Sequence, residues 1–132
     1  MSTLALTIND ETGTGKVVHT FQVEFPLSLV TVADIIEKRV RAEVHQHNTA
    51  RKENFYGLVQ PSEAEAALNG SRSQKFRFID ADKQVEAAKE AFLRNGFFLL
   101  IDNLQAESLD QAFLLHAGSE ISFVKLTPLV GG

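Results

Sequence analysis

Residues 120–126 read Glu120-Ile121-Ser122-Phe123-Val124-Lys125-Leu126 and predict a β-strand, because apolar side chains fill most of its positions. A turn at Ala117-Gly118-Ser119 precedes it. The sequence then closes with Leu129-Val130-Gly131-Gly132, and two consecutive glycines make a thin, flexible tail. We therefore expect a central strand whose carboxyl end leads into a tail at residues 128–132.

A β-hairpin is predicted at the start of the sequence. Leu4, Leu6 and Ile8 alternate with other residues, as is typical of a half-buried strand. The polar, glycine-containing residues 9–16 predict a turn, and residues 17–25 predict the second strand of the hairpin. That second strand should stop before Pro26, which cannot donate a ladder hydrogen bond.

An amphipathic helix is predicted from about residue 32 to about His47. Thr31 and Asp34 have the spacing of a capping pair at its start. Five apolar residues recur at helical spacing and should face the core: Val32, Ile35, Ile36, Val40 and Val44.

Residues 48–96 read as an inserted segment. A capping box at residues 62–65 predicts a short helix ending near Asn69-Gly70, and residues 76–79 predict a brief strand. A second helix is expected over residues 80–94, with Asn95-Gly96 as its stop.

A continuous apolar run, Phe97-Phe98-Leu99-Leu100-Ile101, predicts a strand buried on both faces. Turns are expected at Asp102-Asn103 and at Ser108-Leu109-Asp110.

This order predicts an α+β fold with a mixed sheet and a helix across one face. The first and last strands should run parallel at the centre of the sheet. Residues 1–127 form one domain in this interpretation, with 48–96 as an insertion, and residues 128–132 form the tail.

Composition narrows the classes of function. The 132 residues carry a net charge of −4 and no cysteine. The negative charge disfavours general nucleic-acid binding, which needs a basic face. The lack of cysteine excludes disulfides and thiolate chemistry within the chain. No apolar run has membrane-spanning length and no signal peptide is recognisable, so we expect a cytoplasmic protein without membrane association.

Other motifs favour structural interpretations. Gly13-Thr14-Gly15-Lys16 lacks the first glycine and the final Ser or Thr of a phosphate-binding loop and joins two strands, so it predicts a hairpin loop. His45 and His47 stand two apart and cannot share a metal from one helix face, so no metal site is expected. Lys38, Arg39 and Arg41 are interpreted, with Arg51 and Lys52, as a solvated helix face.

The turn and strand Gly118-Ser119-Glu120-Ile121-Ser122-Phe123 and the ending Pro128-Leu129-Val130-Gly131-Gly132 resemble the end of β-grasp proteins that finish in Gly-Gly. These are ubiquitin, its bacterial relatives and the sulfur carriers of molybdopterin and thiamin synthesis. The resemblance covers residues 3–47 and 97–132. The size is similar to bacterial ubiquitin-like modifiers encoded beside conjugation enzymes in antiphage operons.

The resemblance implies a role for the tail as a substrate of partner enzymes, so the chain itself is not expected to be an enzyme. An E1-like enzyme would adenylate the Gly132 carboxylate with ATP and pass the acyl group to an E2-like enzyme for conjugation to a target protein. A JAMM-type metalloprotease is the implied processing partner, and no bound cofactor is expected. Gly131 would pass through the narrow activating site, and partners would bind Val130 and Leu129 as an extended strand. Pro128, in the same partner-binding tail, either restricts the exit of the tail by its fixed φ or simply ends the strand.

Two alternatives remain open at this point. The Pro-x-x-Gly-Gly ending at Pro128–Gly132 also resembles the sulfur carriers, in which the same carboxylate becomes a thiocarboxylate. The chain could instead be a β-grasp interaction module that is never conjugated. An isopeptide-linked adduct, a thiocarboxylate and indifference to loss of the tail distinguish the three.

Overall fold

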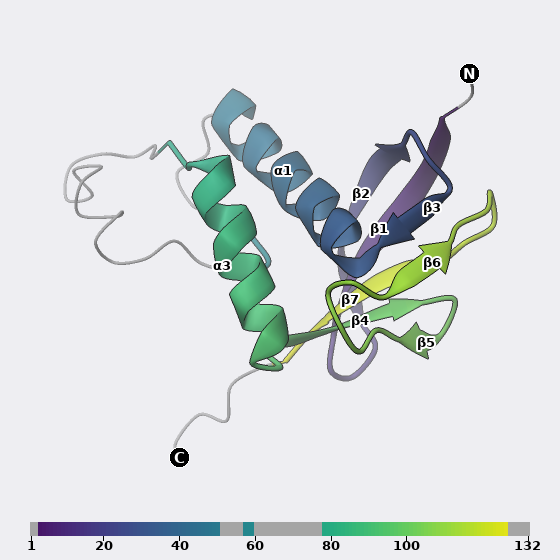
Figure 1. The fold of residues 1–132 in the computed structure, drawn as a ribbon. Coiled ribbons are helices and arrows are strands. Elements are labelled where there is room, and N and C mark those ends of the chain that lie inside the picture. Colours follow the sequence, from purple (N-terminus) through teal and green to yellow (C-terminus); the bar gives the residue numbers. More distant parts are fainter. Residues whose placement is uncertain (1–2, 51–56, 60–77, 127–132) are drawn as a thin grey trace, which may run out of the picture.

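The computed structural model describes residues 3–50, 57–59 and 78–126. They form an α+β fold in which two helices lie against one side of a strongly twisted sheet (Figure 1). The elements are, in order, β1 (Leu4–Thr12), β2 (Val17–Phe25), β3 (Leu29–Thr31), α1 (Val32–Ala50), α3 (Ala81–Leu93), β4 (Phe97–Ile101), β5 (Leu104–Gln105), β6 (Ala112–Leu114) and β7 (Ile121–Lys125).

The main sheet of the described residues has five strands in the order β2-β1-β7-β4-β5. β7 lies at its centre, parallel to β1 with Ile8 opposite Ile121 and antiparallel to β4 with Leu99 opposite Phe123. The predicted parallel pairing of the first and last strands is therefore confirmed. The other two strands, β3 and β6, form a separate small sheet.

The first hairpin is longer than predicted. Residues 9–12 were expected in a turn but continue β1, where they pair with both β2 and β7. The polar composition of these residues is typical of a loop, but Asp10 is buried and held by an ion pair within the fold. The register shifts between Asp10 and Glu11, and residues 17–20 at the start of β2 are all exposed, including Val17, which shares a period-2 pattern with Phe21.

The start of α1 is a reciprocal capping box. The Thr31 amide donates to Asp34 Oδ2 (3.0 Å), and the Asp34 amide donates to Thr31 Oγ1 (3.2 Å). The helix continues to Ala50, slightly beyond the predicted end. Its predicted stripe is confirmed, since all five members are buried: Val32, Ile35, Ile36, Val40 and Val44.

The predicted second helix is α3, which packs along α1 (Figure 1). Asp80 caps it by accepting from the Lys83 amide (3.1 Å). Asn95 adopts a left-handed conformation (φ 61°) and ends it as predicted, while the Gly96 amide returns to the Ala91 carbonyl (2.8 Å). The Asn48 side chain bonds both the amide and the carbonyl of Ile79, which joins the end of α1 to the start of α3.

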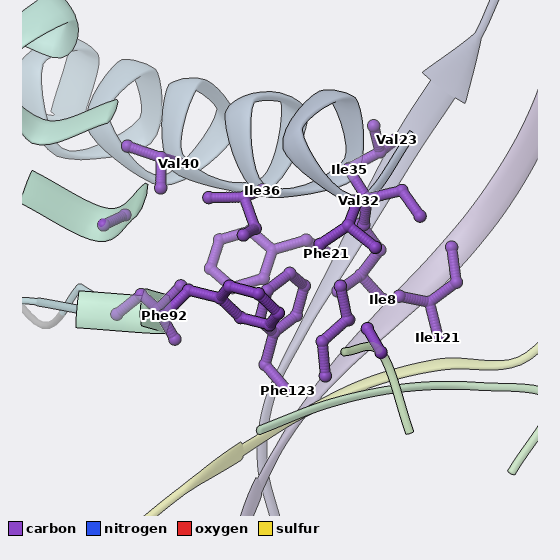
Figure 2. Packing of buried hydrophobic residues seen from close by; sticks show 14 of the residues in the cluster. Ile8, Phe21, Val23, Val32, Ile35, Ile36, Val40, Phe92, Ile121 and Phe123 are labelled. Carbon is purple, nitrogen blue, oxygen red and sulfur yellow. The ribbon is translucent and has the colours of Figure 1, made fainter. Parts of the chain in front are cut away.

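The core lies between α1, α3 and the inner face of the sheet (Figure 2). Phe92, Phe97 and Phe123 form a chain of ring contacts from α3 across the sheet. β4 is buried on one face only: Phe97, Leu99 and Ile101 point inward, and the alternating residues are half-buried. Burial of β4 on both faces was thus a wrong prediction, because the helices cover a single side of the sheet.

The turns between the later strands agree with the sequence. Asp102 and Asn103 both have positive φ (50° and 68°) and connect β4 to β5 as a two-residue hairpin turn. The expected helix at residues 62–69 and residues 76–77 of the expected strand lie outside the described residues. Phe78 and Ile79 are described and are not in a strand.

Candidate functional site

The residues predicted to be conjugated or bound by partner enzymes lie outside the described residues. They are Pro128, Leu129, Val130, Gly131 and Gly132. The structure does describe the point from which they follow. β7 ends at Lys125, where it lies between Thr12 of β1 and Phe97 of β4, and Leu126 after it is exposed. The carboxyl end of the central strand is therefore the candidate site that the described residues allow us to analyse.

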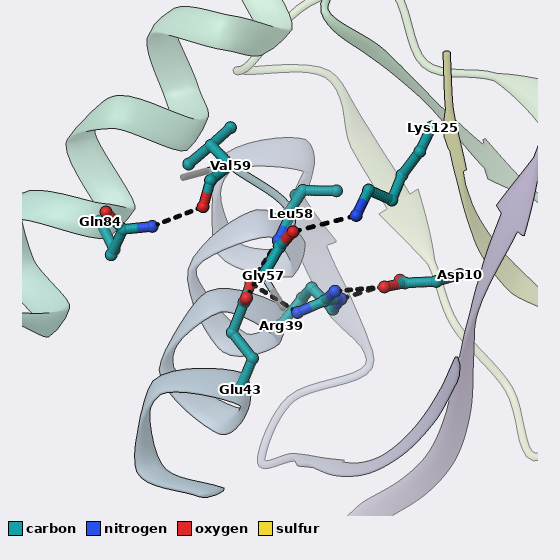
Figure 3. A network of polar contacts seen from close by, with 8 residues as sticks. All are labelled: Asp10, Arg39, Glu43, Gly57, Leu58, Val59, Gln84 and Lys125. Carbon is teal, nitrogen blue, oxygen red and sulfur yellow. Dashed lines mark hydrogen bonds and ion pairs between the residues drawn. The ribbon is translucent and has the colours of Figure 1, made fainter. Parts of the chain in front are cut away.

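A buried ionic network lies beside this end of the sheet (Figure 3). Arg39 of α1 is completely buried, with its guanidinium bound to both oxygens of Asp10 on β1. Nη1 of Arg39 donates to Glu43 Oε1, one helical turn further on (2.6 Å). The interpretation of Arg39 as part of a solvated basic face was wrong, because its side chain points into the core and not to water.

Two aromatic rings also lie near the guanidinium. Its central carbon lies 4.2 Å from the centroid of the Phe21 ring and 5.8 Å from that of Phe123. These cation–π contacts are stronger in a desolvated site than at a surface. Arg39 therefore joins α1, β1, β2 and β7 through one side chain.

Glu43 is a residue of this network whose pKa departs from its ordinary value. Burial raises the pKa of its carboxyl to about 7, because desolvation outweighs the attraction of Arg39 and the hydrogen bond from Leu58. Two carboxylates share a single guanidinium here, and Asp10 makes two of its three ion-pair hydrogen bonds. Protonation of Glu43 therefore leaves the Asp10–Arg39 pair electrically balanced.

Residues 57–59 lie over this network, and we name them the strap. The Leu58 amide donates to both Glu43 oxygens (3.2 and 3.0 Å). The Gly57 carbonyl accepts from Lys125 Nζ (3.0 Å), and the Val59 carbonyl accepts from Gln84 Nε2 of α3 (2.9 Å). The strap thus connects α1, α3 and the end of β7 (Figure 3).

The sequence contained a signal for this network that the charge-based interpretation missed. Arg39 stands three residues after Ile36, and Glu43 stands three after Val40, so both occupy the apolar stripe of the helix. A charged residue on that stripe must be buried with a partner. Arg41, off the stripe, is exposed and pairs with Glu37 (2.9 Å) and Asp82 (2.8 Å).

We expect the raised pKa of Glu43 to make stability depend on pH. Between about pH 4.5 and 7 the folded chain holds a proton on Glu43 that the unfolded chain has lost, so the contribution of Glu43 to the free energy of unfolding falls as pH rises. Glu43→Gln should remove this dependence, which is on the order of 1–3 kcal/mol across the window. Urea unfolding of both proteins at pH 5 and pH 8 measures it, and identical pH dependence would contradict the assignment.

A second surface feature is a groove of about 320 Å³ at the other end of the sheet. Phe25, Pro26 and Val30 line it, together with the exposed side chains of Leu27 and Leu29. It lies beside the pairing of Leu4 with Phe25, whereas β7 ends beside Thr12. The groove and the candidate site are therefore separate surfaces.

The remaining polar groups have structural roles. Residues 13–16 form the hairpin loop predicted for them, closed by the Thr12 amide donating to the Lys16 carbonyl (2.8 Å). Ser119 and His116 both contact Asp102, but the Ser119 hydroxyl bonds Asp102 and not the imidazole, so no nucleophile–base pair is formed.

Within residues 3–50, 57–59 and 78–126, no group of three or more His, Asp or Glu side chains could hold a metal ion. Neither described helix is long and apolar enough to cross a membrane. No protein-family model, curated protein or solved structure matches the chain. The geometry and the sequence are therefore what a functional proposal must rest on.

Proposed function

We propose that this chain is a β-grasp, ubiquitin-like protein modifier that is activated at Gly132 and conjugated to a target, in bacterial antiphage defence. The observation that carries the proposal is the position of β7, parallel to β1 at the centre of the order β2-β1-β7-β4-β5. A hairpin, a helix across one face and a central final strand are the arrangement that the resemblance to β-grasp proteins implies. That strand leads directly toward the Gly-Gly sequence.

The chemistry would take place on partner enzymes. The α-carboxylate of Gly132 is ionised at neutral pH and is a poor acyl donor. An E1-like enzyme would join it to the AMP of ATP, with pyrophosphate leaving. A cysteine thiol of the E1-like enzyme would displace AMP and hold the acyl group as a thioester. A cysteine thiol of the E2-like enzyme would then displace the E1 thiol and carry the acyl group as a second thioester. A lysine amine of the target would then displace the thiol and form an isopeptide bond.

The composition of the chain supports its role as a substrate of partner enzymes that carry out the chemistry. The sequence has no cysteine that could capture its own activated end. Gly131 offers no side chain to clash in a narrow activating site, and Leu129 and Val130 suit recognition as an added strand. The acting form is expected to end at Gly132, whether it is encoded so or a JAMM-type metalloprotease exposes that end.

Loss of the terminal glycines is expected to abolish function without affecting the fold. In cells that carry the native gene, intact-protein mass spectrometry should detect an adduct linked through Gly132. Gly132→Ala and deletion of Gly131-Gly132 should eliminate it while the circular dichroism spectrum and melting temperature stay unchanged. Gly13→Ala is the matched control, because a methyl group there meets no atom within 4 Å.

The other outcomes of this experiment decide against the proposal. A gain in mass equal to the replacement of one oxygen by sulfur at Gly132 would make the chain a sulfur carrier. Unmodified chain alone, in cells that need the gene, would favour an interaction module that is never conjugated. Unfolding of the Gly132→Ala variant would contradict the assignment of residues 128–132 as a tail.

A further inference from the structure

The Gly57–Leu58 peptide group is held between the ammonium group of Lys125 and the carboxyl group of Glu43. Its carbonyl oxygen accepts from the Lys125 ammonium (3.0 Å), and its N–H donates to the Glu43 carboxyl group (3.0 and 3.2 Å). A peptide dipole of about 3.5 D is thereby aligned with a cation at its negative end and an acid at its positive end. Hydrogen bonds that involve a charged group are the stronger class.

Lys125 is a charged residue at an inward-facing position of β7. Ile121, Phe123 and Lys125 alternate along the strand and therefore face the same inner side of the sheet. The first two are completely buried, whereas Lys125 is half-buried and directs its ammonium to the strap (Figure 3). A lysine at the last inward position lets the apolar stem cover the core while the charge reaches a polar partner.

The far side of the strap is also anchored. Leu58 is buried in the hydrophobic core, and Gln84 holds the Val59 carbonyl from α3. Each of the three consecutive residues is thus held by a side chain from a different element, namely Lys125 of β7, Glu43 of α1 and Gln84 of α3. Because the strap is also bonded to α1 and α3, it gives Lys125 at the end of β7 an anchored partner.

We propose that Lys125 is a positioning residue that locks the carboxyl end of β7 to the Gly57–Leu58 peptide and so fixes the end of the strand that precedes the Gly-Gly sequence. This inference rests on the proposed function, because a fixed strand end matters only where a partner enzyme must bind the domain and receive Gly132. The inserted segment thereby acquires a role, since its strap supplies the peptide group that Lys125 holds.

The test combines a structural and a functional readout on the full chain. In Lys125→Met, the Leu58 amide should exchange its hydrogen about tenfold faster or more, since a charge-assisted anchor of its peptide group is lost. The amount of Gly132-linked adduct in cells should fall at least severalfold. Lys125→Arg should restore both readouts because arginine can donate to the same carbonyl. Lys89→Met, a change in a partly exposed lysine of α3, should alter neither.

Each other result overturns the inference in a recognisable way. Faster exchange with normal adduct formation would reduce Lys125 to a structural contact. Less adduct with unchanged exchange would mean that Lys125 acts elsewhere, and failure of Lys125→Arg to restore the adduct would favour a role as an acceptor lysine. Absence of adduct from the wild-type chain would instead be the failure of the proposed function itself.

Discussion

Replacement of Arg39 by methionine is expected to lower the free energy of unfolding by about 3–5 kcal/mol at pH 7. The side chain is completely buried and its guanidinium is the partner of both Asp10 and Glu43. Methionine fills much of the same volume, so the cost comes from the two acids left in an apolar site and not from a cavity. Urea unfolding followed by circular dichroism measures the loss.

Two comparisons separate this electrostatic cause from a general packing defect. Removing the charges of the network, as in Asp10→Val/Arg39→Met/Glu43→Gln, should recover most of the lost stability. No charge then remains buried, and the amide oxygen that Glu43→Gln introduces can still accept from the Leu58 amide. Lys38→Met, on the exposed neighbour of Arg39, should change stability by less than about 0.5 kcal/mol. If the triple variant is less stable than Arg39→Met, the network is a net source of stability and our account of it is wrong.

Ile36→Asp is expected to unfold the domain. Ile36 is completely buried between α1 and the inner face of the sheet (Figure 2). The substitution removes a core side chain and places a carboxyl group where the surrounding cluster is apolar, at a combined cost of about 5 kcal/mol or more. That cost is comparable to the whole stability of a typical domain. Loss of near-ultraviolet circular dichroism and of a cooperative melting transition would be observed.

The matched change Ile36→Val keeps the site apolar and should cost only about 0.5–1.5 kcal/mol. A cooperative transition at the wild-type melting temperature in Ile36→Asp would show that the stripe does not face the core.

Local signals were sufficient to predict most of the architecture. Thr31 and Asp34 define the start of α1 by their spacing, and Asp80 and Asn95 bound α3 in the same way. The parallel pairing of β1 with β7 was predicted from the order of the elements, in which one amphipathic helix separates a first hairpin from an apolar final strand. In each case the prediction depended on a sequence signal that can be read directly, such as capping residues a few positions apart or a repeated apolar pattern.

Prediction failed where polar residues depend on partners distant in sequence. Residues 9–12 have the composition of a turn, and only their pairing with β7 makes them a strand. The apolar stripe places Arg39 on the buried face of α1, but its partner Asp10 is brought beside it only by the fold. The strap could not be anticipated, because Gly57 and Leu58 carry no capping or periodic signal and are fixed by side chains from three other elements.

The parallel pairing of β1 with β7 also determines when the sheet can be completed during translation. β1 is translated early, yet one of its two neighbours in the sheet is β7, the last of the described strands in the sequence. Until residues 121–125 emerge, β1 and β4 have no strand between them, and the nascent chain exposes the apolar faces of both. Long-range pairing of this kind is slow to form. A ribosome that stalls before Ile121 therefore releases a product that cannot complete its sheet, so interrupted synthesis should yield chains open to proteolysis.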